Sequence, residues 1–315
     1  NHFENMAKSL TEQFGLKDNS LVVDIGSNDG LLLKKFKDFG IRVLGVEPAE
    51  NICEIARENG IDTLCGFFDN NIASNIINIK GRADVITANN VFAHVHDIKD
   101  LTKNVKKLLK ENGVFIIEVQ YLLDTIKNLT FDNIYHEHVS YFSVMSLAEF
   151  FRQQEMEMFK VEHADTHGGS VRAYIQNKGG RNIIDKSVID FLEAERIFGL
   201  DKFETYQKFA MRINDAKERI RAFTIRAKNE GKKIIGYGAP AKATTLLNFY
   251  NIGNEHIDYI IEDNPLKQGK TVPGVRIPIV SKQSLGTIAP DYIYLLAWNF
   301  ADEIMKNNPG FSQNG

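Results

Sequence analysis

The first 120 residues alternate between short apolar runs and stretches in which apolar residues recur at helical spacing. Runs rich in aliphatic and β-branched residues predict strands at 21–25, 41–47, 83–88 and 113–119. Helices are predicted at 3–14, 31–39, 50–59 and 98–110, and three of these four stop at a glycine. Strands that alternate with helices in this way form parallel βαβ units. The pattern therefore predicts a doubly wound α/β domain.

A charged segment separates this domain from a second strand–turn–helix unit. Residues 183–230 keep their apolar residues at helical spacing and contain no proline, which predicts helices that join two domains. A strand then enters a glycine turn at 236–238, and a helix at 243–249 and strands at 257–261 and 292–296 follow. We therefore expect domains at 1–182 and 231–315, joined by a helical region at 183–230, with the second α/β domain the smaller.

Composition narrows the class of protein. The 315 residues are 43% hydrophobic and 25% charged, which is typical of a globular chain. The net charge of −3 predicts no attraction to nucleic acid or to an anionic membrane, and no apolar run approaches the ~18 residues of a membrane span. Two cysteines are too few for a disulfide framework or a thiolate zinc site. A cytoplasmic enzyme is the expectation.

The first predicted strand ends in the turn Asp24-Ile-Gly26-Ser-Asn28-Asp29-Gly30. Glycines at such a turn let a ligand approach the backbone, and the amide groups of the helix start face that ligand. The spacing differs from the Gly-x-Gly-x-x-Gly of dinucleotide binders. Glu47 closes the second strand, where a carboxylate can accept two hydrogen bonds from a ribose diol. An ordinary βαβ turn with a solvent-facing Glu47 is the alternative.

Together the turn and Glu47 resemble class I S-adenosylmethionine-dependent methyltransferases, whose cofactor domain is Rossmann-like. The cofactor-binding residues that this resemblance implies are Asp24, Gly26, Asn28 and Gly30 in the turn, Glu47 at the ribose, Phe68 and Asp69 at the adenine, and Asn89 beneath the sulfonium. S-adenosylmethionine is accordingly the expected cofactor.

Six of the eight histidines lie between positions 94 and 167. In Tyr135-His136-Glu137-His138, a strand would place both histidines on one face and Glu137 on the other. Such a cluster could bind a metal, could consist of packed histidines in a polar loop, or could perform general acid–base catalysis, for which an imidazole pKa near ~6.5 is suited.

Three longer segments resemble the sugar C-methyltransferase family. They are Phe131–Ser143, which contains the Tyr-His-Glu-His motif, Thr166–Arg172, and Gly236–Lys242. The resemblance covers nearly the whole chain. Members of that family methylate nucleotide-linked 4-keto-deoxysugars, typically at C3. They usually begin with a small zinc domain bearing cysteine ligands, which these 315 residues lack, so we expect a trimmed chain or a shortened relative.

The family resemblance also implies residue roles. His138 would be the general base, with Tyr135 and Glu137 close by and His94 as a further active-site histidine. The base would remove the hydrogen alpha to the ketone, and Tyr135 or a second histidine would donate a hydrogen bond to the developing enolate. The carbanion would then accept the methyl group, and no metal would be needed.

Further residues are candidates for substrate binding. His167, Ser170 and Arg172 could line the same cleft, although Arg172 could equally be a surface charge on a strand. Gly238 and Lys242 lie in the second glycine turn, where amides and a lysine would suit the diphosphate of a nucleotide sugar, which we expect to be linked to dTDP. Trp298 is expected to pack in the fold. We expect a monomer or a homodimer.

Other functions remain open at this level. An O- or N-methyltransferase would keep the cofactor site without removing a proton from carbon. An NAD-dependent oxidoreductase would use one of the glycine turns, and a nucleotide-sugar binder without activity would keep only the binding sites.

Overall fold

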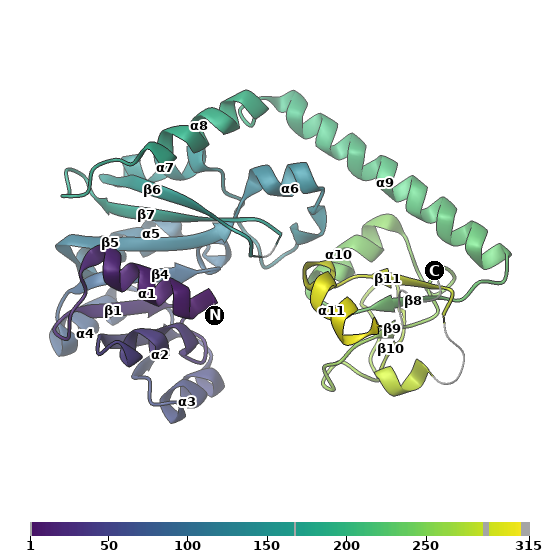
Figure 1. The fold of residues 1–315 in the computed structure, drawn as a ribbon, viewed down its shortest axis with the longest axis horizontal. Helices are drawn as coiled ribbons and strands as arrows, with labels where there is room; N and C mark the ends of the chain where they lie inside the picture. Colours follow the sequence, from purple (N-terminus) through teal and green to yellow (C-terminus); the bar gives the residue numbers. More distant parts are fainter. Residues whose placement is uncertain (1, 167, 286–289, 310–315) are drawn as a thin grey trace. The chain divides into compact units, whose positions relative to one another are not determined.

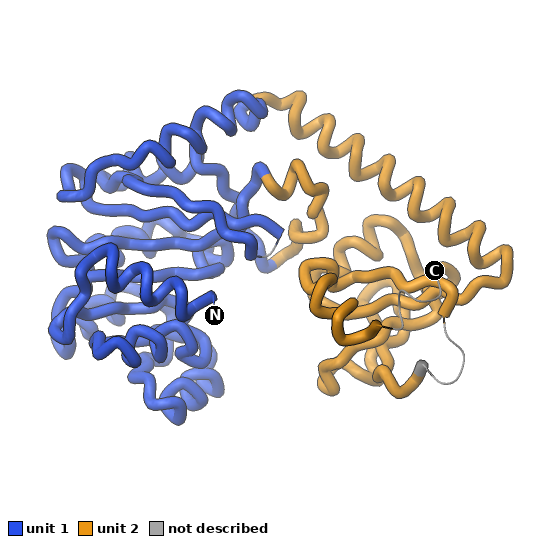
Figure 2. The backbone as a smooth tube through the Cα atoms, in the orientation of Figure 1, with its two compact units in different colours: residues 1–123, 137–201 blue, residues 124–136, 202–315 orange. Residues whose placement is uncertain are grey.

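The computed structural model describes residues 2–166, 168–285 and 290–309, and its chain forms two compact units (Figures 1 and 2). Unit 1 comprises residues 1–123 and 137–201, and unit 2 comprises residues 124–136 and 202–315. The stretch expected as a joining region is thus divided between the units at residue 201. The assignment of 124–136 to unit 2 has no counterpart in the sequence pattern.

Unit 1 is built on a seven-stranded sheet in the order β3-β2-β1-β4-β5-β7-β6. Its strands are β1 (Leu21–Ile25), β2 (Arg42–Glu47), β3 (Thr63–Cys65), β4 (Ala83–Asn89), β5 (Leu109–Gln120), β6 (Met156–Ala164) and β7 (Ser170–Asn177). The pairs from β3 to β5 are parallel, and β7 runs antiparallel to both of its neighbours. The doubly wound α/β prediction is confirmed, although the pattern did not predict β6 and β7.

The helices of unit 1 alternate with its strands. They are α1 (His2–Phe14), α2 (Leu31–Asp38), α3 (Glu50–Glu58), α4 (Asn70–Lys80), η1 (Phe92–His94), α5 (Ile98–Leu108), α7 (Val144–Gln153) and α8 (Lys186–Phe198), and α6 (Leu122–Asn128) runs from unit 1 into unit 2.

Strand β5 illustrates how both faces of the sheet are covered. Ile116 belongs to the same buried cluster as Phe36 of α2. Its neighbour Phe115 contacts Phe92 and Phe151 of α7, with ring centroids 6.3 and 6.2 Å away. Because successive strand residues face opposite sides, apolar packing on both faces leaves the ends of the strands as the place for polar function.

Unit 2 holds a smaller parallel sheet in the order β10-β9-β8-β11. Its strands are β8 (Ile234–Tyr237), β9 (Ile260–Ile261), β10 (Ile279–Val280) and β11 (Tyr292–Leu295). Its helices are η2 (Phe131–Asn133), α9 (Phe203–Asn229), α10 (Ala241–Tyr250), η3 (Lys282–Leu285), η4 (Trp298–Phe300) and α11 (Ala301–Asn307). The prediction of a second, smaller α/β region is confirmed. Among the described helices, none has the length and apolarity that crossing a membrane would require.

Candidate active site

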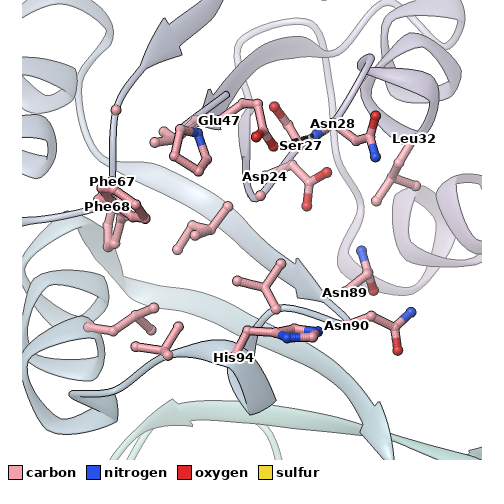
Figure 3. A pocket seen from close by; sticks show the side chains of 18 of the residues that line it. Asp24, Ser27, Asn28, Leu32, Glu47, Phe67, Phe68, Asn89, Asn90 and His94 are labelled. Atoms are coloured by element: carbon pink, nitrogen blue, oxygen red, sulfur yellow. Dashed lines mark hydrogen bonds between the residues drawn. The ribbon is translucent and has the colours of Figure 1, made fainter. Parts of the chain in front are cut away.

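A pocket of 860 Å³ opens in unit 1 where β1, β2 and β4 end. Of the predicted cofactor-binding residues, the pocket is lined by Asp24, Gly26, Asn28, Glu47, Phe68 and Asn89. Figure 3 shows Asp24, Asn28 and Glu47 on one side of the pocket and Asn89 and His94 on the opposite side. The carboxyl edge of a parallel sheet is where α/β domains bind their ligands.

The turn after β1 requires glycine at its first position. Gly26 has a φ of +67°, and its N–H donates to the carbonyl of Val46 at 2.8 Å. A Cβ on Gly26 would lie 2.3 Å from Cγ2 of Val91. Gly30, with a φ of +81°, is not a lining residue; it begins α2, where a Cβ would lie 2.8 Å from the side chain of Ile61. Gly30 therefore serves the helix start.

The turn holds the carboxylate of Glu47 in place. Oε2 accepts the backbone N–H of Asn28 at 3.1 Å, and Oε1 accepts that of Ala49 at 3.0 Å. Each carboxylate oxygen can accept two hydrogen bonds. Glu47 thus keeps acceptor capacity toward the pocket, which is what a ribose diol needs.

Asp24 places a second carboxyl group at the pocket. It is 5% exposed, and its Oδ1 accepts the hydroxyl of Thr87 at 2.6 Å. Burial raises the pKa of Asp24 to about 7, the Thr87 hydrogen bond partly opposes this rise, and the charge of Glu47 adds to it. A cationic ligand would favour the ionised form of this group.

Asn89 provides a direct indication that the pocket takes a polar ligand. Both the Nδ2 and the Oδ1 of Asn89 are buried, and neither has a hydrogen-bond partner among the described residues. Buried polar side-chain groups are nearly always paired in proteins. S-adenosylmethionine fits this donor set, since it carries hydroxyls, an ammonium, a sulfonium and a carboxylate.

The segment after β3 contributes an aromatic wall. Phe68 lines the pocket, and so does Phe67, which is 80% exposed and which the motif analysis did not name. Asp69 is not a lining residue: its Oδ1 accepts the N–H groups of Asn71 and Ile72 and caps α4. Its expected role at the adenine stays a prediction.

His94 lies at the pocket wall beside a second histidine. Its Nδ1 is 2.7 Å from the carbonyl oxygen of Glu137, and its ring centroid is 4.9 Å from that of His138. Because a carbonyl only accepts, Nδ1 carries the proton, and the Nε2 of a neutral His94 keeps its lone pair. The ring of Tyr141 lies on His138 edge to face at 6.3 Å.

The Tyr-His-Glu-His motif does not form the strand considered from its alternation. Residues 135–138 form a turn, with Tyr135 and His136 in unit 2 and Glu137 and His138 in unit 1. The face argument for the two histidines was therefore wrong: tertiary contacts, rather than a pleat, orient their rings. Within the described residues no three histidine, cysteine or carboxylate side chains cluster as metal ligands would.

Arg172 is engaged within unit 1 and is not a surface charge. Its guanidinium donates to Oε2 of Glu118 on β5, from Nη2 at 2.7 Å and from Nε at 3.2 Å. Burial alone would lower the pKa of Arg172, but the Glu118 carboxylate and the Tyr174 hydroxyl together raise it. Glu118 is 1% exposed and also accepts the hydroxyl of Thr166. Glu118 is the lone carboxylate of the apolar run 114–119, which signals a charge that needs a partner but does not say which residue supplies it.

The other residues predicted at the substrate differ in their surroundings. Ser170 is fully buried and donates to the carbonyl of Thr166 at 3.1 Å. His167 lies outside the described residues. Gly238, in unit 2, lines a separate pocket of 370 Å³.

Lys242 lies in a buried cluster of unit 2. Its Nζ is 3.6 Å from the ring centroid of Trp298, whose indole N–H donates to Oδ2 of Asp132 at 2.7 Å. Burial lowers the pKa of Lys242 to about 8, and the nearby Asp132 partly offsets this. Burial also raises the pKa of Asp132, against the effects of Trp298 and Lys242. Trp298 packs, as expected, and it also connects the two charged groups.

Comparisons with known proteins agree with this geometry. The sequence of residues 1–161 matches the family described as methyltransferase domain, and residues 165–315 match the C-methyltransferase C-terminal domain. The chain is 37% identical over 314 residues to C-methyltransferase NovU from Streptomyces niveus, covering 100% of this chain and 75% of that relative.

More distant similarities concern the amino-terminal part. A ubiquinone biosynthesis O-methyltransferase from Rhodopseudomonas palustris (strain TIE-1) is 28% identical over 115 residues, which cover 36% of this chain and 44% of that relative. The crystal structure of an S-adenosylmethionine-dependent methyltransferase from Clostridium acetobutylicum ATCC 824 superposes with a TM-score of 0.45 at 12% identity, over 56% of this chain and 91% of that one. The full-length match and the two domain matches together establish that the chain belongs to the S-adenosylmethionine-dependent C-methyltransferase family.

Proposed function

We propose that the protein methylates the carbon alpha to the ketone, C3, of a nucleotide-linked 4-keto-deoxysugar, with His138 as the general base. The observation that carries the proposal is the histidine pair of unit 1: His94 lines the same pocket as Glu47 and Asn89, and the His138 ring lies against it at 4.9 Å. An imidazole beside the methyl-donor pocket suits the removal of a weakly acidic carbon-bound proton.

Different residues of the pocket would bind different parts of S-adenosylmethionine. Glu47 would hold the ribose of S-adenosylmethionine, Asn89 and Asp24 its amino-acid and sulfonium end, and Phe67 and Phe68 its adenine. When bound, S-adenosylmethionine supplies an electrophilic methyl group.

The histidines would handle the proton. His138 takes the C3 proton, and the electron pair of the C–H bond moves into an enolate with its charge on the C4 oxygen. A hydrogen-bond donor at that oxygen would stabilise the charge, the role expected of Tyr135 or a second histidine. The lone pair on Nε2 of His94 can stabilise the imidazolium of His138, since Nδ1 of His94 is committed to the Glu137 carbonyl. The C3 carbon would then take the methyl group, and the electron pair of the broken carbon–sulfur bond would stay on sulfur, so that S-adenosylhomocysteine leaves.

The proposal predicts that His138→Asn lowers turnover by ~10²–10⁴-fold, the usual contribution of a general base, while the affinity for S-adenosylhomocysteine stays within about threefold. Single-turnover rates and calorimetric titration measure the two effects. His163→Asn is the matched control, because that histidine lies on β6 beside Asp165 and outside the pocket lining. Near-full turnover in His138→Asn would remove His138 from the role.

Hydrogen exchange at the sugar tests the reaction type itself. Incubation of the protein with a nucleotide-linked 4-keto-deoxysugar in D₂O, with S-adenosylhomocysteine in place of the methyl donor, should exchange the hydrogen at C3. His138→Asn should abolish the exchange. A chain that methylates an oxygen or a nitrogen would leave the carbon-bound hydrogen in place and would contradict the proposal.

A further inference from the structure

The turn after β8 in unit 2 repeats the turn after β1 in unit 1. Each begins with a glycine in the left-handed region, Gly26 at φ +67° and Gly238 at φ +82°. The glycine N–H donates to a carbonyl on the neighbouring strand, that of Val46 at 2.8 Å and that of Ile261 at 2.7 Å. Val46 is the strand partner of Ile25, the residue before Gly26. Ile261 is likewise the strand partner of Tyr237, the residue before Gly238.

In both units a glutamate comes directly after the residue whose carbonyl accepts the glycine N–H. It is Glu47 at the end of β2 and Glu262 just after β9. Oε2 of Glu47 accepts an N–H of its turn at Asn28, and Oε2 of Glu262 accepts an N–H of its turn at Ala239, at 2.8 Å. Oε1 of each glutamate accepts the N–H two residues further along the chain, at 3.0 Å in both. The two carboxylates therefore accept a similar pair of backbone N–H groups, and Oε2 of Glu262 also lies 3.7 Å from Nζ of Lys267.

The correspondence extends to the strand on the other side. A Cβ on Gly26 would lie 2.3 Å from Val91, which follows β4, and a Cβ on Gly238 would lie 2.5 Å from Ala297, which follows β11. The order β10-β9-β8-β11 thus matches β3-β2-β1-β4. Unit 2 repeats the half of the α/β fold that forms a ribose-binding turn.

The turn of unit 2 opens into a pocket of its own. The side chain of Glu262 is 13% exposed and lines the pocket of 370 Å³, a volume within the ~300–1,000 Å³ of small-molecule sites. Phe300 adds an aromatic face to this pocket, Lys267 and Lys282 add cationic groups, and Asp263 and Glu303 add carboxylates. Nζ of Lys267 lies 3.7 Å from Oε2 of Glu262 and donates to the carbonyl of Ala239 at 3.0 Å. These side chains suit the three parts of a nucleotide: Phe300 the base, Glu262 the ribose, and the lysines the phosphates.

We propose that this pocket binds a ribonucleoside diphosphate, with Glu262 accepting hydrogen bonds from the 2′- and 3′-hydroxyls of the ribose. The inference rests on the proposed function for its choice of a nucleotide-linked ligand. Each oxygen of Glu262 holds one backbone N–H and can accept a second hydrogen bond, which matches two adjacent hydroxyls. A 2′-deoxyribose offers only one of them, so the site favours a ribonucleotide over the dTDP expected from the family resemblance.

Paired nucleotides that differ by one hydroxyl test the proposal. Calorimetric titration of the full chain with UDP, CDP, GDP and ADP, each beside its 2′-deoxy form, should find a ribonucleotide that binds about 10–100-fold more tightly than its deoxy form, the ratio expected for one hydrogen bond to a charged group. Absence of binding by all four, or equal affinity for the two members of the binding pair, overturns the inference.

Variants assign the preference to one residue. Glu262→Gln should abolish the preference and leave S-adenosylhomocysteine binding unchanged, which also reports that the chain is folded. Asp263→Asn removes a neighbouring carboxylate whose oxygen accepts the hydroxyl of Tyr237, and it should keep the preference. A preference that survives in Glu262→Gln contradicts the proposal. If that variant fails to fold, the comparison of the paired nucleotides on the unaltered chain still decides.

These binding results are separable from the reaction. A chain that prefers ribonucleotides but neither exchanges nor methylates a keto-sugar would refute the proposed function alone. A chain that methylates the sugar without any preference for the ribo form would refute this inference alone.

Discussion

The two glycine–glutamate turns share their backbone geometry and differ in the charges around them. Asp24 occupies the penultimate position of β1, whereas Gly236 occupies the penultimate position of β8. The described lining of the unit 1 pocket includes three aspartate or glutamate residues and no lysine or arginine. The lining of the unit 2 pocket also includes three such residues, Glu262, Asp263 and Glu303, and it adds Lys267 and Lys282.

The comparison separates two properties of such a turn: how its carboxylate is held, and which charges surround it. The hydrogen bonds that hold Glu47 and Glu262 prepare a carboxylate for a diol in either unit. In our proposal the surrounding groups then select the rest of the ligand, a cationic methyl donor in unit 1 and, through Lys267 and Lys282, an anionic diphosphate in unit 2. Position in the fold determines how the carboxylate is held, and the side chains that line each pocket determine the surrounding charge.

The strongest test of the shared geometry replaces the two turn glycines. Gly26→Ala and Gly238→Ala should each cost about 2–4 kcal/mol in the free energy of unfolding, because each Cβ meets a packed side chain and φ is positive. Gly40→Ala is the control: it has a φ of +77° but open space around its Cβ, and should cost only about 1 kcal/mol. Urea titration measures all three, and a loss in only one of the two turns would break the comparison.

The second test removes the charge of Glu47, the carboxylate that we propose binds the ribose of the cofactor. Glu47→Gln should weaken S-adenosylhomocysteine binding about 10–100-fold, since hydrogen bonds to a charged acceptor are each worth about 1.5–3 kcal/mol. Binding of nucleoside diphosphates in unit 2 should be unchanged. Calorimetry measures both affinities, and a parallel loss of both would mean that the two turns do not act independently.

The third test uses Asp24, at whose position in the strand unit 2 has Gly236. Because the pKa of Asp24 is raised to about 7, the affinity for S-adenosylmethionine should fall about tenfold per pH unit below that value and level off above pH 8. The same shift, from 3.8 to about 7, means that the folded chain without ligand loses stability as pH rises through this range. Asp24→Asn should flatten both profiles. Unchanged pH dependence in that variant would assign the titration to another group.

The smallest expected effect concerns the cations of unit 2. Lys282→Met should weaken nucleoside diphosphate binding about two- to fivefold at low salt, and less at high salt, because an exposed charge is screened. S-adenosylhomocysteine binding should not respond. An equal loss for the nucleoside without phosphates would show that Lys282 does not act on the phosphates.

Residues that end neighbouring parallel strands were predictable as a group. Glu47 and Asn89 lie far apart in sequence, yet both line one pocket, because the carboxyl ends of β2 and β4 meet at the same edge of the sheet. Arg172 and Lys242 were predicted at the substrate, and this role stays a prediction. Arg172 meets Glu118 across the β5–β7 pair, and nothing in local sequence announces an antiparallel partner 54 residues away.

The sequence by itself determined the α/β class, the glycine turns, the glutamate after the second strand and the family resemblance, since these follow from local periodicity and spacing. Only the tertiary structure decided which polar groups come together: the amide of Asn89, buried without a partner among the described residues, the His94–His138 pair, the Asp132–Trp298–Lys242 cluster and the hydrogen bond from the turn to Glu262. The reason is physical. Burial, hydrogen bonding and charge pairing depend on which segments the packed strands bring together, and a linear pattern of residues carries no distance between them.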